Sequence, residues 1–156
     1  MCAIIDANVR DQVFGVKQPQ AGEFLFNWLN SDKGTVKLVV GGKLLRELSD
    51  SKAFNTWLQT ALLFGRAQRI PDDKVEIATK ELQDQQICKS DDEHVLALAK
   101  LSGARLLFTN DKPLQKDFGN RQILGGIQGK VYTTVKYEHV TSTHKALLRR
   151  TDLCGT

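Results

Sequence analysis

The sequence predicts an α/β fold, a three-layer α/β/α sandwich with a mostly parallel central sheet. Short apolar segments typical of buried strands alternate with amphipathic segments typical of helices along nearly all of the 156 residues. Two of the strand segments are followed at once by polar residues and an acid. No repeat, low-complexity stretch or linker interrupts the alternation, and we therefore expect residues 1–156 to form a single domain.

The predicted strands are short runs of mainly β-branched and other apolar residues, which suit the interior of a sheet covered on both faces. They span residues 2–6, 35–40, 104–109 and 130–135. Each connection between consecutive strands contains at least one predicted helix, which is the arrangement that joins parallel strands. The sheet is therefore expected to be mostly parallel.

The predicted helices carry apolar residues at intervals of three or four positions. They span residues 21–31, 43–48, 53–67, 90–103, 111–118 and 143–150, and a further helix begins after Pro71, which two acids follow. The segment Ser90-Asp-Asp-Glu93 is typical of a capping box in which Ser90 is the N-cap residue. Gly103 is a natural residue for the C-terminal end of the same helix.

Composition limits the environment of the chain. The formal net charge of +4 permits a polyanionic partner without requiring one. No apolar stretch approaches the roughly 20 residues of a transmembrane helix, and the first strand begins at residue 2, so we expect neither a membrane span nor a targeting segment. The three cysteines are scattered without the spacing of a metal site, which indicates a reduced, cytoplasmic compartment.

Acids from four distant parts of the sequence are expected to meet at one edge of the sheet. Asp6 and Asp111 follow predicted strands, and ligands of open parallel sheets bind at the carboxyl ends of the strands. Asp92 lies in the first turn of the helix that leads to the strand before Asp111. Glu47 lies one helical turn beyond the strand of residues 35–40.

Clustered carboxylates repel one another unless a cation neutralises them, and hard divalent cations prefer oxygen ligands. The four acids therefore indicate a site for Mg²⁺ or Mn²⁺, two ions between which the sequence does not distinguish. Such an ion can polarise a phosphate and activate a water molecule, so the pattern is typical of phosphodiester hydrolysis.

Each acid also has a plainer interpretation. Asp111 fits a turn, while Asp91 and Asp92 fit the start of a helix, where acids complement the helix dipole. Glu47 fits a solvated helix face. Asp6 is the hardest to explain in this way, because burying an acid after Ala-Ile-Ile is costly unless it binds something. The metal hypothesis therefore depends on the joint placement of the four acids.

The ordered motifs resemble those of the PIN-domain family over most of the chain, and in particular its small single-domain prokaryotic members. The segments that carry the resemblance are Ile4-Ile-Asp-Ala-Asn8, Gly42-Lys-Leu-Leu-Arg-Glu-Leu48, Asp92-Glu-His-Val-Leu-Ala-Leu-Ala99 and Leu106-Leu-Phe-Thr-Asn-Asp111. The resemblance implies a metal-dependent ribonuclease that cleaves RNA through the four acids named above. Small PIN domains are frequently the toxins of toxin–antitoxin pairs, so the resemblance also brings in an antitoxin or another protein as a candidate partner.

The resemblance further implies roles for residues near the acids. Asn8 and Thr109 would hold the carboxylates through hydrogen bonds, and Asp91 is the alternative to Asp92 as the third acid. Asp117 is expected at the surface, with a carboxylate that supports the fourth acid as the alternative. His94 is expected on the helix surface or partly buried. Basic residues expected beside the pocket would contact RNA phosphates, and these are Lys43, Arg46, Lys112 and Lys116.

Two other functions stay open. One is a catalytically idle PIN-like module that binds RNA or protein, although a scaffold has no reason to cluster four acids. The other is a different Mg²⁺-dependent α/β enzyme, but Asp6 lacks the second acid that such enzymes usually carry at the first strand. No GxxxxGK[ST] loop is present, which argues against nucleotide hydrolysis. The aromatic helix segment 57–64 is a candidate face for a homodimer or a protein partner.

Overall fold

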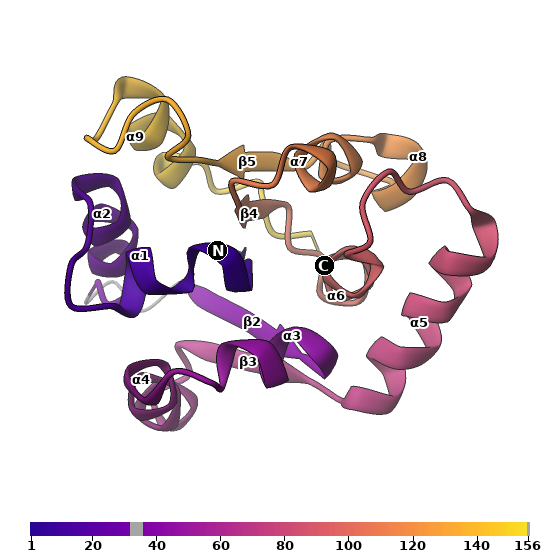
Figure 1. Cartoon of the computed structure of the whole chain (residues 1–156), viewed down its shortest axis with the longest axis horizontal. Coiled ribbons are helices and arrows are strands. Elements are labelled where there is room, and N and C mark those ends of the chain that lie inside the picture. The colour runs from indigo at the N-terminus through magenta and orange to yellow at the C-terminus, as the bar shows by residue number, and fades with distance from the viewer. Residues whose placement is uncertain (32–35, 156) are drawn as a thin grey trace.

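The computed structural model describes residues 1–31 and 36–155, which build a central sheet of five strands between layers of helices (Figure 1). The strands are β1 (Cys2–Ile5), β2 (Lys37–Gly41), β3 (Ala67–Ile70), β4 (Leu106–Phe108) and β5 (Lys130–Tyr132). They lie in the order β3-β2-β1-β4-β5, and every neighbouring pair is parallel. The predicted three-layer α/β/α class is confirmed.

Helices connect the strands and cover both faces of the sheet. Helices α1, α2, α4 and α9 lie on one side, and α5, α6 and α8 lie on the other (Figure 1). None of the described helices is long and apolar enough to span a membrane. The bounds are η1 (Ala7–Val9), α1 (Arg10–Phe14), α2 (Gln20–Leu29), α3 (Gly42–Leu48), α4 (Lys52–Leu63), α5 (Asp72–Gln85), α6 (Glu93–Ser102), α7 (Lys112–Phe118), α8 (Arg121–Leu124) and α9 (Ser142–Arg149).

Burial on both faces explains why the strand segments are almost continuously apolar. All four residues of β1 are buried, and Ile4 and Ile5 are 0% exposed. On one side, α6 packs between α5 and the strands β2 and β3. Its residues 94–99 are all buried, so this helix is covered all round instead of on one stripe. The removal of apolar surface from water at these positions is the main force that holds the layers together.

The order of the strands reverses between β1 and β4. From β1 the chain continues to β2 and β3 on one side, and it then crosses back to place β4 and β5 on the other side. In open parallel sheets, such a reversal leaves a crevice outside the carboxyl ends of the two central strands. Asp6 directly follows β1, and Asp111 follows β4 after two residues. The topology therefore places two of the predicted acids at this reversal.

Strand β3 is not predicted by the sequence pattern, which indicates one helix over residues 53–67. In the structure, α4 ends at Leu63, and Ala67 begins the edge strand β3. The two central residues of β3, Gln68 and Arg69, are exposed, so the strand has too few apolar positions for a recognisable pattern. In the predicted strand 35–40, Thr35 lies outside the described residues, and β2 begins at Lys37.

The capping box expected at Ser90 is wrong. Helix α6 begins at Glu93, its N-cap residue is Asp92, and the Asp92 side chain forms no capping hydrogen bond. Ser90 is buried, and its hydroxyl accepts a long 3.4 Å hydrogen bond from the backbone N–H of Asp92. The helix end expected at Gly103 is confirmed, because this residue adopts a left-handed conformation with φ of 81°.

A disulfide joins Cys2 in β1 to Cys154 near the C-terminus. Ala104 pairs with Cys154 in an antiparallel bridge, so the C-terminal segment lies beside the residues that lead into β4. Disulfides form and persist in oxidising environments. The expectation that all the cysteines are reduced is therefore wrong for this pair, whereas Cys88 is free.

Candidate functional site

Asp6 is buried at the carboxyl edge of the sheet. Its backbone N–H donates to the carbonyl of Phe108 at 2.9 Å, which extends the pairing of β1 with β4 to the acid itself. Its Oδ2 accepts a 2.7 Å hydrogen bond from the hydroxyl of Thr109. Burial raises the pKa of Asp6, the hydrogen bond from Thr109 opposes this change, and the charges of Asp111 and Glu47 raise the pKa further.

Thr109 links Asp6 to Asp111. Its hydroxyl donates to Asp6 and also accepts the backbone N–H of Asp111 at 3.1 Å. Asp111 is the N-cap residue of α7, and its Oδ1 accepts from the backbone N–H of Leu114 at 3.3 Å. Asp111 therefore caps a helix, as the simpler interpretation predicts, and its carboxylate also lies near the other acids.

Asp92 faces the other acids from the start of α6. Burial raises the pKa of Asp92 to about 6, and the charges of the other three acids contribute to the increase. A hydrogen bond to the Asp111 side chain acts in the same direction. Asp6, Glu47 and Asp111 each lie close enough to Asp92 for their charges to raise its pKa, although the four acids come from separate segments.

Asp91 points elsewhere. It is exposed and lines a separate cavity of about 390 Å³ between α3, α5 and α6, together with Lys43, Arg46 and His94. Of the two neighbouring acids, the structure therefore brings Asp92 and not Asp91 to the acidic cluster.

The loop before Asp92 is held in place by Asp117. This acid is buried, at 2% exposure, so the expectation of a surface position is wrong. Its carboxylate accepts the backbone N–H of Lys89 at 2.9 and 3.0 Å and the backbone N–H of Ser90 at 2.8 Å. Asp117 thus fixes the two residues that lead into the acidic loop 91–92, which is a positioning role.

A signal for the burial of Asp117 is present in the sequence. Leu114, Asp117 and Phe118 lie three and four positions apart, which places them on the same face of α7. All three are buried, so the helical periodicity of this segment points the acid inward with its apolar neighbours.

Glu47 approaches the cluster from α3. Its backbone carbonyl accepts a 3.1 Å hydrogen bond from Arg10, which ties α3 to α1. Its Oε1 lies 3.0 Å from Nε2 of His94, but the orientation of the two groups is not that of a hydrogen bond, and neither buried atom has another partner. Burial, aided by the charge of Lys43, lowers the pKa of His94 to about 4. The buried ring is therefore neutral at pH 7 and does not compensate the charge of Glu47.

The four carboxylates carry like charges, and no bound lysine or arginine among the described residues neutralises them. Within the described part of the chain, none of the four forms an ion pair with a lysine or an arginine. The buried Oε1 of Glu47 has no hydrogen-bond donor. An all-oxygen donor set with excess negative charge suits a hard divalent cation, so the residue types fit Mg²⁺ or Mn²⁺.

The side chains do not form a complete set of metal ligands as they stand. Among residues 1–31 and 36–155, no group of three or more His, Cys, Asp or Glu side chains is arranged to hold a metal ion. Besides burial, the charges of the other three acids raise the pKa of Asp92, but the four carboxylates would have to turn toward a common point to bind an ion.

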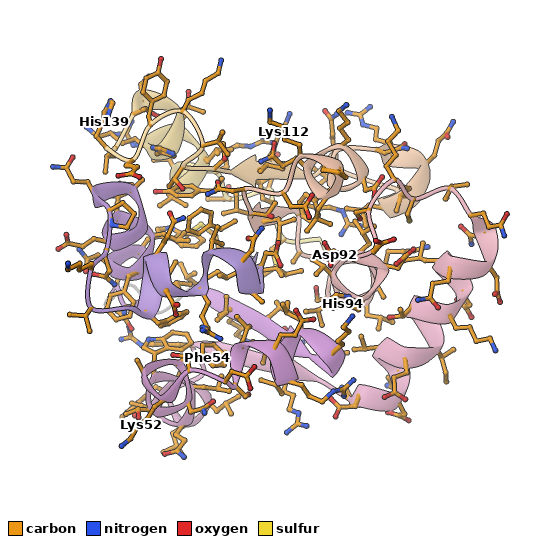
Figure 2. All side chains as sticks on the ribbon, in the orientation of Figure 1. Lys52, Phe54, Asp92, His94, Lys112 and His139 are labelled. Atoms are coloured by element: carbon orange, nitrogen blue, oxygen red, sulfur yellow. A yellow bond between two sulfur atoms is a disulfide. The ribbon has the colours of Figure 1, made fainter. Side chains whose placement is uncertain are left out.

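The predicted basic residues lie on the two helices that border the acids. Lys43 and Arg46 are exposed on α3, the helix that also carries Glu47. Lys112 and Lys116 are exposed on α7, which begins directly after an acid of the cluster. Figure 2 shows Lys112 above Asp92 in that view.

Asn8 does not take the supporting position expected for it. Its side chain is exposed on η1, and in the described ranges it forms no hydrogen bond with any of the four acids. Thr109, the other residue expected to hold a carboxylate, does so through its hydrogen bond to Asp6.

A polar network that the sequence does not signal joins the ends of β4 and β5. The Oδ1 atom of Asn110 accepts the Thr133 hydroxyl at 2.7 Å and the Thr134 backbone N–H at 2.9 Å, while its Nδ2 donates to the Thr134 hydroxyl at 2.9 Å. That hydroxyl donates to Gln12 on α1 at 2.7 Å. The network fixes the residue before Asp111, but Asn and Thr are also ordinary loop residues, so their types alone reveal nothing.

The fold and the site define an α/β protein with an acidic cluster at the reversal point of a parallel sheet. Comparison of the chain with protein-family models, with curated proteins and with solved structures finds no match.

Proposed function

We propose that the chain is a divalent-metal-dependent ribonuclease of the PIN type, in which Asp6, Glu47, Asp92 and Asp111 hold Mg²⁺ or Mn²⁺. The proposal is supported by the placement of Asp6 and Asp111 outside the carboxyl ends of β1 and β4, where Thr109 bonds to both. The charges of Glu47 and Asp92 act on this pair or are acted on by it. Clustered carboxylates destabilise the metal-free protein. Such an arrangement is expected where a cation is bound for function.

The acids have different parts in this proposal. Asp6 is the most rigid ligand, because its backbone belongs to the sheet and its side chain is held by Thr109. Asp92 and Asp111 lie at the starts of α6 and α7, and their side chains would turn toward a common ion. Bound Mg²⁺ or Mn²⁺ would supply the polarisation of the phosphate and an activated water.

RNA is the proposed substrate because the acidic cluster is bordered by exposed cations. Lys43 and Arg46 on one helix, and Lys112 and Lys116 on the other, would contact phosphates on either side of the scissile bond. These contacts position the strand without reading its sequence. A role as the toxin of a toxin–antitoxin pair is part of the proposal, with a protein antitoxin as the partner.

The test compares the wild-type chain with Asp6→Asn on labelled single-stranded RNA, in Mn²⁺, in Mg²⁺ and in EDTA. The matched control is Asp73→Asn, which removes an exposed acid on α5 that lies outside the cavity lined by Lys43 and Arg46. We expect cleavage by the wild type and the control only with metal, and none by Asp6→Asn. Titration with Mn²⁺ should show binding that Asp6→Asn loses.

Two results would overturn the proposal. Cleavage that persists in EDTA or in Asp6→Asn would show that the acids do not carry the reaction. A wild-type chain that neither binds Mn²⁺ nor cleaves any of a varied set of RNAs would instead be a binding module without activity.

A further inference from the structure

A second cavity, of about 480 Å³, lies between α7, β5, the segment after β5 and α9. Val131, Val135 and Leu147 supply apolar parts of its lining, to which Tyr137 also belongs. The Tyr137 ring lies 5.2 Å from the ring of His139 in an edge-on arrangement. Val135 and Tyr137 are each 53% exposed, which is high for apolar side chains that line a cavity. The cavity is therefore an open, partly apolar recess with an accessible aromatic ring.

The recess adjoins residues 109–111 in three places. Lys112 in its lining directly follows Asp111. Gln115 in its lining donates to the backbone carbonyl of Thr109 at 3.1 Å. Thr133 in its lining donates to Asn110 at 2.7 Å. A molecule bound in the recess would thus lie next to the loop that presents the fourth acid.

The charge of the recess suits an anionic ligand with an apolar part. Lys112 and Lys136 are exposed in its lining, and no carboxylate is among the described residues that line it. The hydroxyls of Ser142 and Thr143 add exposed hydrogen-bonding groups. A nucleotide combines these features, since it joins a flat base with polar edges to a charged phosphate.

We infer that this recess binds one nucleotide of single-stranded RNA, with the base against Tyr137 and the phosphate near Lys112 and Lys136. The neighbouring phosphate of the strand would then extend toward Asp111. Only an unpaired base can enter, because a duplex keeps its bases stacked and paired. The substrate preference of the ribonuclease, which rests on the proposed function, is therefore for single-stranded RNA.

The experiment measures binding without cleavage. A fluorescently labelled single-stranded oligoribonucleotide of mixed sequence is titrated in EDTA with the full chain, and fluorescence anisotropy reports the affinity. The variants are Tyr137→Ala and Lys136→Gln. Their matched controls are Phe64→Ala, an exposed aromatic at the end of α4, and Lys52→Gln, which lies far from Lys112 (Figure 2).

We expect Tyr137→Ala to weaken binding about tenfold, because this is the change in affinity that corresponds to the stacking of one base on an aromatic ring. Lys136→Gln should weaken binding and reduce its salt dependence. Both controls should bind like the wild type, and unlabelled duplex RNA should compete poorly. The inference is overturned if the wild type does not bind, if the variants bind as tightly as their controls, or if the duplex competes equally well.

The same assay separates this inference from the nuclease proposal. Asp6→Asn should retain RNA binding in EDTA, because Asp6 does not line the recess. If the wild type binds RNA through the recess but cleaves no RNA with any metal, the nucleotide site stands and the nuclease proposal fails. If it cleaves RNA while Tyr137→Ala binds normally, the nuclease stands and the recess is not the nucleotide site.

Discussion

The hydroxyl of Thr109 donates a 2.7 Å hydrogen bond to Oδ2 of Asp6, although the two residues lie 103 positions apart in the sequence. The same hydroxyl accepts the backbone N–H of Asp111 at 3.1 Å. One side chain therefore sets the relative positions of two acids that follow the two central strands. The backbones of Asp6 and Thr109 both extend the pairing of the sheet, so these two residues are anchored to its central strands.

The first prediction concerns this hydrogen bond. Thr109→Val keeps the branched shape of the side chain but removes the donor to Asp6 and the acceptor for Asp111. We expect metal affinity and RNA cleavage to fall about 10- to 100-fold, the usual effect of losing a residue that orients a metal ligand. Mn²⁺ titration and cleavage rates check this, with the exposed Thr60→Val on α4 as the control. Unchanged Mn²⁺ affinity would contradict it.

A second prediction distinguishes the two neighbouring acids before α6. Asp92→Asn should reduce cleavage by more than about 100-fold, because losing a ligand costs more than losing a residue that orients one. Asp91→Asn removes an exposed acid that lines the other cavity, and its rate should stay close to that of the wild type. Single-turnover cleavage of the same RNA compares them. The reverse order of effects would show that Asp91 is the functional acid.

A third prediction follows from the raised pKa of Asp92. In the folded protein this pKa is about 6, against an ordinary value of 3.8. Above pH 6 the ionised Asp92 destabilises the metal-free fold. As the pH falls through 6, the folded protein takes up the proton while the unfolded chain does not until about pH 3.8, so stability is regained. Asp92→Asn should therefore raise the Tm at pH 8 by about a few degrees.

Thermal melts in EDTA at pH 8 and pH 5 check this third prediction. The gain from Asp92→Asn should shrink at pH 5, where the wild-type carboxyl is largely protonated. The lowered pKa of His94 affects both proteins alike and cancels in the comparison. An equal gain at both pH values would show that the charge of Asp92 is not its cause.

A fourth prediction concerns Asp117, which holds the loop before Asp92. Asp117→Asn places an amide N–H₂ group or a single carbonyl oxygen against two backbone N–H donors. We expect a loss of about 1–3 kcal/mol in the free energy of unfolding, measured by urea denaturation, because buried donors lose their charged acceptor. The exposed Asp84→Asn should leave the unfolding midpoint unchanged. A variant as stable as this control would contradict the assigned role.

A fifth prediction concerns the disulfide between Cys2 and Cys154, whose sequence separation is 152. Replacing both residues by serine should lower the free energy of unfolding by about 2–4 kcal/mol, since the crosslink restricts the unfolded chain. Dithiothreitol should bring the wild-type Tm down to that of the double variant and leave the double variant unchanged. Cys88→Ser, which removes the free thiol, should behave like the wild type. A wild-type Tm that does not respond to dithiothreitol would refute this contribution.

Much of the fold could be predicted from the sequence, because its signals are local. The apolar run before Asp6, the stripe of α2 and the glycine after α6 each determine their own element. Strand β3 could not be predicted, because an edge strand with two exposed central residues has no periodic pattern of its own. The capping box predicted at Ser90 is absent, since Asp117 binds the backbone N–H groups of Lys89 and Ser90, and the helix begins at Glu93.

The sequence by itself determined the kind of elements, their alternation and the presence of acids after two strands, because these properties depend on neighbouring residues. The tertiary structure decided that β1 and β4 are adjacent, that Asp92 and not Asp91 turns toward the cluster, and that Thr109 bridges two acids. It also decided the pairing of Cys2 with Cys154. These contacts join residues far apart in the chain. They depend on how whole layers pack together, which the preferences of neighbouring residues do not determine.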